Sequence, residues 1–154
     1  MEITQLLELN HLAVGVQASD KVELINSVVD LLAGDPAIKD LEVVRRAVLE
    51  REESMSTAVG KGLALPHAKT SSVTGVTVAL AITKEPVDFH ALDNEPVRIV
   101  FLLVGRQDSK SQHVRILSRI SRMMNRDENR RLFLEAQSAE ELLARVKEAE
   151  ARLN

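Results

Sequence analysis

The chain has 154 residues, a length typical of one domain with its own hydrophobic core. Apolar residues make up 45% and charged residues 28% of the sequence, which is the balance of a globular protein. A formal net charge of −3 and only 2% aromatic residues argue against nucleic-acid binding, which relies on clustered cations and stacking rings. Because no cysteine is present, disulfides, thiolate catalysis and zinc–thiolate sites are excluded.

The sequence carries no sign of export or membrane insertion. Its first residues, 1–5, lack the basic region and the long apolar stretch of a secretory signal. No uninterrupted apolar segment approaches the roughly 20 residues that a helix needs to span a bilayer. We therefore expect a cytoplasmic protein without direct membrane insertion.

The first third of the chain is predicted to be helical. Apolar spacing predicts a helix that begins at Ser19 and ends near Gly34. Asp40 is a suitable N-cap for a second helix that runs to about Arg51. Residues 53–62 are small, polar or flexible, and they predict a loop.

Strands are predicted in the middle of the chain. Residues 63–65 predict a short strand that delivers His67 at its end. Residues 76–82 mix alternation with a buried run, and residues 97–104 are apolar almost throughout, as in a central strand covered on both faces. A polar loop is expected at 105–111.

The C-terminal third is again predicted to be helical. One helix is expected over 112–125, and a second is expected to be capped by Asp127. Ser138 and Glu141 form a capping-box pattern for a third helix. Helices, then strands, then helices favour one α/β or α+β domain with helices packed on a sheet.

Histidines are the principal candidates for chemistry. The chain contains His11, His67, His90 and His113. Their spacings match no metal motif, and the segment 60–62 has neither P-loop nor dinucleotide-binding spacing, so no metal or nucleotide cofactor is expected. We interpret His11 and His90, which lack supporting neighbours, as structural or surface residues.

A possible site combines two histidines with one arginine. His67 follows Pro66 at the end of a glycine-containing loop, where the backbone conformation is tightly restricted. His113 lies at the first turn of a predicted helix, and ligand sites of open α/β sheets form beyond the carboxyl ends of strands, so the two histidines could meet there. The planar guanidinium of Arg51 suits a phosphoryl group. The alternative is that each is a packing or surface residue.

The segment 51–67 resembles the signature of one type of enzyme IIA. The matching features are Arg51-Glu52, then Ser-Thr, a Gly-x-Gly turn, an apolar stretch and Pro-His. This is the fructose–mannitol–nitrogen type of the bacterial phosphoenolpyruvate-dependent phosphotransferase system. The resemblance covers nearly the whole chain, although residues 105–109 replace the family's proline-containing loop before the second histidine. It implies a single α/β domain over 1–154, with a mixed β-sheet flanked by helices.

The resemblance also implies a phosphohistidine carrier. His67 would accept a phosphoryl group on Nε2 from an HPr-type phosphocarrier protein or its nitrogen-branch counterpart. His113 and Arg51 match family active-site positions and would contact the phosphoryl oxygens. Because the donor is another phosphohistidine, this scheme requires neither ATP nor a metal ion.

Three roles remain open within this resemblance. A free-standing domain favours the nitrogen-regulatory role, in which regulatory target proteins sense the phosphorylation state. A sugar-specific unit would instead pass the phosphoryl group to a IIB domain. A binding module that keeps the fold but transfers no phosphoryl group is the third possibility, and the presence of all three candidate residues argues against it.

A basic stripe is predicted on the helix after the second strand. Its residues are Arg115, Arg119, Arg122 and Arg126. Such a stripe could dock an acidic partner or membrane headgroups. The favoured interpretation is a solvated face that is partly neutralised by Glu128 and other carboxylates.

Overall fold

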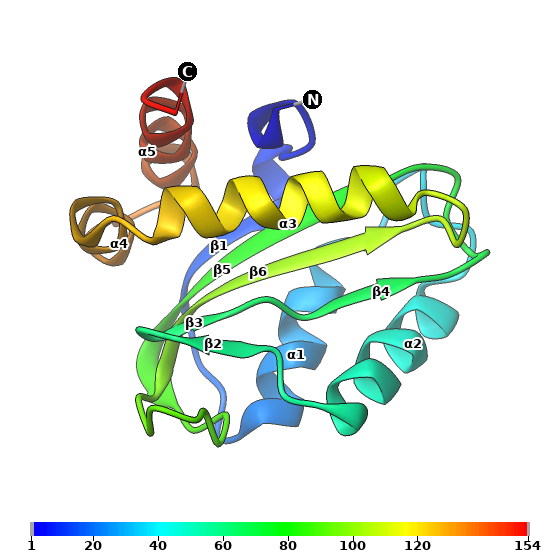
Figure 1. Cartoon of the computed structure of the whole chain (residues 1–154), viewed down its shortest axis with the longest axis horizontal. Coiled ribbons are helices and arrows are strands. Elements are labelled where there is room, and N and C mark those ends of the chain that lie inside the picture. Colours follow the sequence, from blue (N-terminus) through cyan, green and yellow to red (C-terminus); the bar gives the residue numbers. More distant parts are fainter. Residues whose placement is uncertain (1, 154) are drawn as a thin grey trace.

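The computed structural model describes residues 2–153, in which one mixed six-stranded sheet forms the centre of the molecule (Figure 1). The strands are β1 (Leu12–Val16), β2 (Ala58–Gly60), β3 (Leu63–Ala64), β4 (His67–Lys69), β5 (Thr77–Val87) and β6 (Val97–Gly105). Their order is β1-β5-β6-β3-β2, and β4 also pairs with β6. The β5/β6 and β2/β3 pairs are antiparallel, whereas β1 is parallel to β5, and β3 and β4 are parallel to β6.

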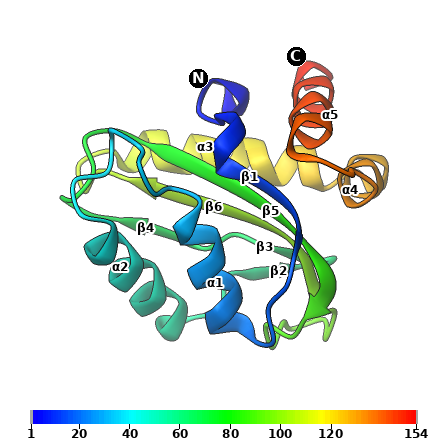
Figure 2. The ribbon, with the colours of Figure 1, turned by 180° about the vertical axis from the view of Figure 1, so that it is seen from behind.

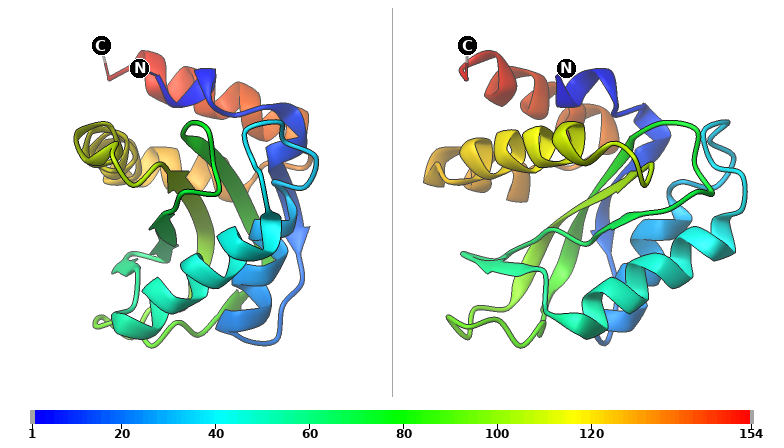
Figure 3. Two further views of the ribbon diagram at one scale, coloured as in Figure 1. Left: turned by 90° about the vertical axis from the view of Figure 1, so that its right-hand side faces the viewer. Right: turned by 45° about the vertical axis from the view of Figure 1, so that its right-hand side comes forward.

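Helices cover both faces of this sheet. They are α1 (Lys21–Asp30), α2 (Leu41–Ser54), α3 (Lys110–Met124), α4 (Asp127–Leu134) and α5 (Ala139–Ala151), preceded by the 3₁₀ turns η1 (Ile3–Gln5) and η2 (Leu9–His11). The first two helices pack on one face, and α3, α4 and α5 pack on the other together with η1 (Figures 2 and 3). The prediction of a mixed sheet flanked by helices is confirmed.

The central strands alternate between two hydrophobic cores. In β6, Phe101 and Leu103 belong to the core under α3, whereas Leu102 and Val104 belong to the core under α1 and α2. All four side chains are fully buried. Because both faces of β6 are covered, its sequence shows an apolar run rather than an alternation. The prediction of a doubly covered central strand at 97–104 is therefore confirmed.

The helix starts agree with the sequence patterns in two cases. Asp40 caps α2 by accepting hydrogen bonds from the backbone N–H groups of Glu42 and Val43. Ser138 caps α5 by accepting one from the N–H of Glu141 at 3.1 Å. A side-chain oxygen placed here satisfies an N–H group that has no partner inside the helix.

The other helix boundaries differ from those predicted. Asp20, not Ser19, is the N-cap of α1, because its carboxylate accepts the N–H of Glu23 at 2.8 Å. The α1 helix ends at Asp30 rather than near residue 34, and α2 continues three residues past Arg51. Asp127 is the first residue of α4 rather than its cap.

The strand predictions were wrong at three places. Residues 58–60 were predicted as a loop but form β2. This strand pairs with β3, and a tight turn connects the two. His67 begins β4 instead of ending the short strand at 63–65. The chain also contains β1, so the order does not begin with helices. The apolar stretch 12–16 was the available signal for this strand, but its place beside β5 depends on long-range pairing.

The turn between β2 and β3 requires glycine. Gly60 has a φ of +93°, a conformation that is strained for residues with a side chain. A Cβ atom added here would lie 3.0 Å from Oδ2 of Asp93. The same carboxylate oxygen accepts the N–H of Lys61 at 2.9 Å. The loop before β6 is thereby bound to the turn that precedes His67.

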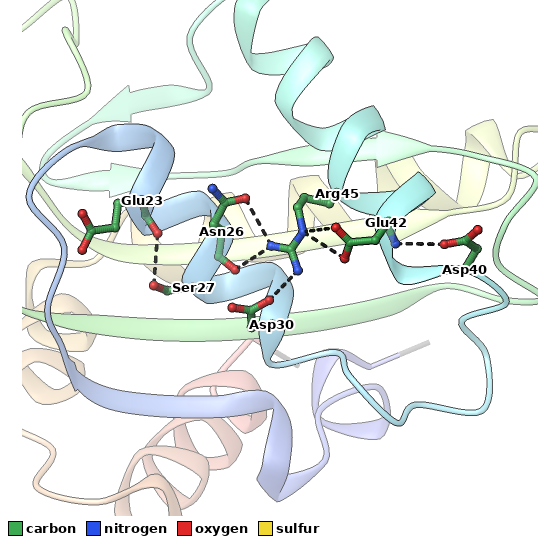
Figure 4. Close-up of polar contacts among 7 residues, drawn as sticks. All are labelled: Glu23, Asn26, Ser27, Asp30, Asp40, Glu42 and Arg45. Carbon is green, nitrogen blue, oxygen red and sulfur yellow. Dashed lines mark hydrogen bonds and ion pairs between the residues drawn. The ribbon is translucent and has the colours of Figure 1, made fainter.

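Arg45 connects the two helices on the face opposite α3 (Figure 4). Its Nη1 donates to the backbone oxygen of Asn26 at 3.1 Å, and its Nη2 pairs with the carboxylate of Asp30. Its Nε donates to Glu42 one turn earlier on α2. These contacts fix α2 against α1, and the C-terminal end of α2 carries Arg51.

Candidate active site

His67 is presented by the backbone on which it lies. His67 is the first residue of β4 and pairs with Leu103 of β6. The backbone N–H of Leu103 donates to the carbonyl oxygen of Pro66 at 3.0 Å. The ring Nδ1 of His67 lies 2.7 Å from the carbonyl oxygen of Leu65. A carbonyl can only accept a hydrogen bond, so Nδ1 carries the proton in neutral His67. The lone pair is then on Nε2.

His113 lies beside His67 in the first turn of α3. The two ring centroids are 5.5 Å apart, and the rings are inclined at 60°. His113 is only 4% exposed, and its two nitrogens have no hydrogen-bond partner among the described residues. A Cβ at position 105 would lie 3.2 Å from His113 Nδ1, so Gly105 leaves the space that the ring occupies.

Arg51 completes the group from the last turn of α2. Its Nη1 donates to the backbone oxygen of Met55 at 3.0 Å, which holds the guanidinium near the helix end. Arg51, His67 and His113 line one cleft of about 550 Å³. The structure thus brings together the three side chains that the sequence singled out.

Two lysines in the same cleft were not predicted. Lys69 and Lys110 line it together with the three candidate residues. Their spacing from the histidines could have identified them. Lys69 lies two residues after His67 on a strand, so the two side chains share a face. Lys110 lies three residues before His113 on a helix, so these two side chains are neighbours. The cleft therefore has an excess of positive charge.

Burial and charge keep both imidazoles neutral. The pKa of His67 is lowered, first by burial and then by the charges of Arg51 and Lys69, against the opposing effect of the Leu65 hydrogen bond. The pKa of His113 is lowered to about 4 by burial, by His67 and by Lys69. At neutral pH, His67 therefore has a free lone pair inside a positively charged cleft.

The remaining histidines lie elsewhere. His11 is buried, and its Nε2 lies 3.2 Å from the Asp35 carboxylate, which also accepts a hydrogen bond from the Thr77 hydroxyl. The side chain of His90 is 80% exposed, near Asp88. Both agree with their interpretation as structural and surface residues.

A carboxylate other than Glu128 partly neutralises the arginine stripe, within what the sequence led us to expect. Arg119 pairs with the buried Glu150 at 2.6 Å, whereas Glu128 lies 3.6 Å from Arg152. Arg115, Arg119 and Arg122 line a second cavity along α3. Arg126 lies beyond the end of that helix, at the N-cap of α4, so the predicted four-residue stripe is interrupted.

The arrangement suits the transfer of an anionic group to a nitrogen. A neutral imidazole can attack an electrophilic phosphorus atom, and guanidinium and ammonium groups can stabilise the oxygens around it. Within residues 2–153, no cluster of three or more His, Asp or Glu side chains could hold a metal ion. In the same range, no helix is long and apolar enough to cross a membrane.

Comparison with known proteins places the chain in a family. A family model described as the phosphoenolpyruvate-dependent sugar phosphotransferase system, EIIA 2, matches residues 5–149. The chain therefore belongs to this enzyme IIA family, as the sequence motif indicated.

Named relatives fall into two functional groups. The fructose-specific EIIABC component of Bacillus subtilis is 33% identical over 143 residues, which are 93% of this chain and 22% of that protein. The chain thus spans about a fifth of that relative's length. The fructose-specific EIIA component of Haloferax volcanii is 32% identical over 150 residues, 96% of this chain and 97% of that one.

A solved structure represents the second group. The nitrogen regulatory protein IIA-Ntr from Neisseria meningitidis superposes with a TM-score of 0.86 at 28% identity. The match covers 94% of this chain and 98% of that one. The fold is therefore that of an enzyme IIA of this type, and both sugar-specific and nitrogen-regulatory proteins are among its relatives.

Proposed function

We propose that this chain is a phosphohistidine carrier of the phosphotransferase system, with His67 as the phosphorylated residue. The observation that carries the proposal is the 2.7 Å contact between His67 Nδ1 and the Leu65 carbonyl. It leaves the Nε2 lone pair free in a cleft that also contains Arg51 and His113. In this proposal the phosphoryl donor is an HPr-type phosphocarrier protein. The chain itself is cytoplasmic, and its residues 1–154 act as one domain.

The transfer needs no external base. The Nε2 lone pair of His67 attacks phosphorus, and the P–N bond to the donor imidazole breaks. If the donor ring is protonated on its other nitrogen, it leaves as a neutral imidazole. The new phosphoimidazolium of His67 keeps its Nδ1 proton on the Leu65 carbonyl. One imidazole replaces another, so no proton has to move between the partners, and alignment and charge stabilisation remain the protein's task.

The neighbouring side chains act on the phosphoryl oxygens. Arg51 offers a planar fork of donors, and neutral His113 can donate one ring N–H. Lys69 and Lys110 add charge at the same cleft. Because charge accumulates on these oxygens during transfer, such fixed donors lower the barrier.

The role of the carrier rests on what accepts the phosphoryl group next. We propose the nitrogen-regulatory role, in which target proteins bind one phosphorylation state, supported by the full-length match to IIA-Ntr. The sugar-specific alternative, with a IIB domain as acceptor, is supported by the full-length match to a fructose-specific EIIA component. Incubating the phosphorylated chain with fructose-type IIB domains distinguishes them: rapid transfer to IIB would favour the sugar-specific role.

Labelling with radioactive phosphoenolpyruvate tests the central proposal. With enzyme I and an HPr-type protein present, the chain should acquire an acid-labile phosphoryl label, and His67→Ala should abolish it. His90→Ala, which removes an exposed histidine outside the cleft, is the matched control and should label normally. Undiminished labelling of His67→Ala would refute the assignment of the phosphorylated residue.

A further inference from the structure

Glu52 is a buried carboxylate that the transfer chemistry leaves unused. It follows Arg51 in the last turn of α2, but its side chain is directed into the protein and only 6% of the residue is exposed. Burying an ionised carboxylate is costly unless donors surround it. The groups that donate hydrogen bonds to this carboxylate therefore indicate its role.

Three donors meet this carboxylate. Its Oε2 accepts the backbone N–H of Thr57 at 2.7 Å and pairs with Lys21 Nζ at 3.1 Å. Its Oε1 accepts the hydroxyl of the same threonine. Thr57 is therefore held at both its backbone and its side chain, and it is itself only 4% exposed. Hydrogen bonds to a charged acceptor are about twice as strong as neutral ones.

The same threonine is bound to the segment that carries the nucleophile. The carbonyl of Thr57 accepts the N–H of Leu65 at 3.0 Å. The carbonyl of Leu65 then accepts the ring Nδ1–H of His67 at 2.7 Å. An unbroken series of hydrogen bonds thus leads from the Glu52 carboxylate to the imidazole of His67.

We propose that Glu52 is a positioning residue for phosphoryl transfer, which acts through Thr57 and Leu65 to hold the His67 imidazole in its Nδ1–H tautomer with Nε2 directed at the cleft. This inference rests on the proposed function, since it assigns the control of the same nucleophile. Adjacent positions at the end of α2 then have different tasks. Arg51 faces the phosphoryl group, and Glu52 aligns the atom that attacks it.

The charge of Glu52 also acts directly on His67. Its carboxylate raises the pKa of His67, against the stronger lowering by burial. This effect acts through space and does not depend on Thr57 or Leu65, so the tautomer of His67, not its titration, tests the positioning role. Glu52→Gln keeps the size and one acceptor oxygen, but it removes the charge. The pKa of His67 should therefore fall in this variant.

The test combines NMR of the ring with transfer kinetics on the full chain. In ¹⁵N-histidine-labelled wild-type protein, the ring shifts should report the Nδ1–H tautomer of His67. Thr57→Val removes the hydroxyl donor, so the Nδ1–H population should fall and labelling by the HPr-type donor should slow about tenfold, since small misplacements of reacting groups are costly. Thr57→Ser should restore both, and Glu53→Gln, an exposed neighbour, should change neither.

Each outcome decides the inference. If folded Thr57→Val and Glu52→Gln keep the wild-type tautomer and rate, the positioning role is wrong. Should Thr57→Val not fold, the tautomer in Glu52→Gln decides in its place. A wild-type chain that accepts no phosphoryl label would refute the proposed function alone, because the tautomer is measured without transfer.

Discussion

The imidazole rings of His67 and His113 lie with their centroids 5.5 Å apart, one at the start of β4 and the other in the first turn of α3. At this separation a proton on one ring disfavours a proton on the other. Both pKa values are lowered, and that of His113 is lowered to about 4. The pair therefore presents two neutral rings at neutral pH, of which one can attack while the other donates.

Removing the second imidazole should slow transfer without abolishing it. In His113→Ala, the nucleophile and Arg51 remain, so we expect labelling by the HPr-type donor to slow about 10- to 100-fold. The free energy of unfolding should change little, because the cost of the cavity is offset by the loss of two unpaired buried nitrogens. Rapid-quench labelling measures the rate. An unchanged rate would remove His113 from the site.

The rate of phosphoryl transfer to His67 should fall at acidic pH, since a protonated imidazole has no free lone pair. Because the pKa of His67 is lowered, the midpoint of this loss should lie below the ordinary histidine value of 6.5. Lys69 contributes to this lowering for both rings. Lys69→Met should therefore shift the acid limb of the rate to higher pH. Lys84→Met, at an exposed lysine outside the cleft, serves as the control. A Lys69→Met profile that coincides with wild type would contradict the electrostatic account.

Folding stability should also depend on pH through His113. Its pKa is about 4 in the folded state, against an ordinary value of 6.5, so the unfolded chain binds the proton more strongly between these values. The contribution of His113 to the free energy of unfolding is therefore complete above pH 6.5, and it decreases as the pH falls towards 4. Urea titrations across this window measure it. His113→Gln, which does not titrate, should show a shallower dependence.

Arg51 should matter for both rate and titration. Arg51→Ala removes a donor fork from the cleft, and we expect transfer to slow about tenfold or more. Because this guanidinium lowers the pKa of His67, the pKa should rise in the variant. Arg46→Ala removes an exposed arginine of the same helix and should leave both unchanged. Equal effects of the two substitutions would show that only the overall charge matters.

Two glycines with similar φ angles should respond differently to alanine. Gly34 has a φ of +85° and open space around it, so Gly34→Ala should cost only the conformational strain, about 1 kcal/mol. Gly60 has a φ of +93°, and a Cβ there would meet the Asp93 carboxylate at 3.0 Å. Gly60→Ala should therefore lower the unfolding free energy more. Equal losses in urea unfolding would mean that the Asp93 contact is readily displaced.

The sequence alone determined the features that depend on neighbours along the chain. The caps Asp40 and Ser138 are local, because a cap oxygen bonds N–H groups two or three residues away. The apolar run of β6 follows from burial on both faces. The segment that ends in Pro66-His67 indicated the family, and the family model confirmed it.

Tertiary structure decided the features that depend on long-range contacts. β1 takes its place only by pairing with β5, and the buried charge of Glu52 is matched by Thr57 and Lys21. Whether His67 and His113 share a cleft was likewise decided by the packing of α3 on the sheet. The physical reason is that hydrogen bonds, burial and charge act between residues that are close in space. A sequence pattern indicates such contacts only where the residues are also close along the chain.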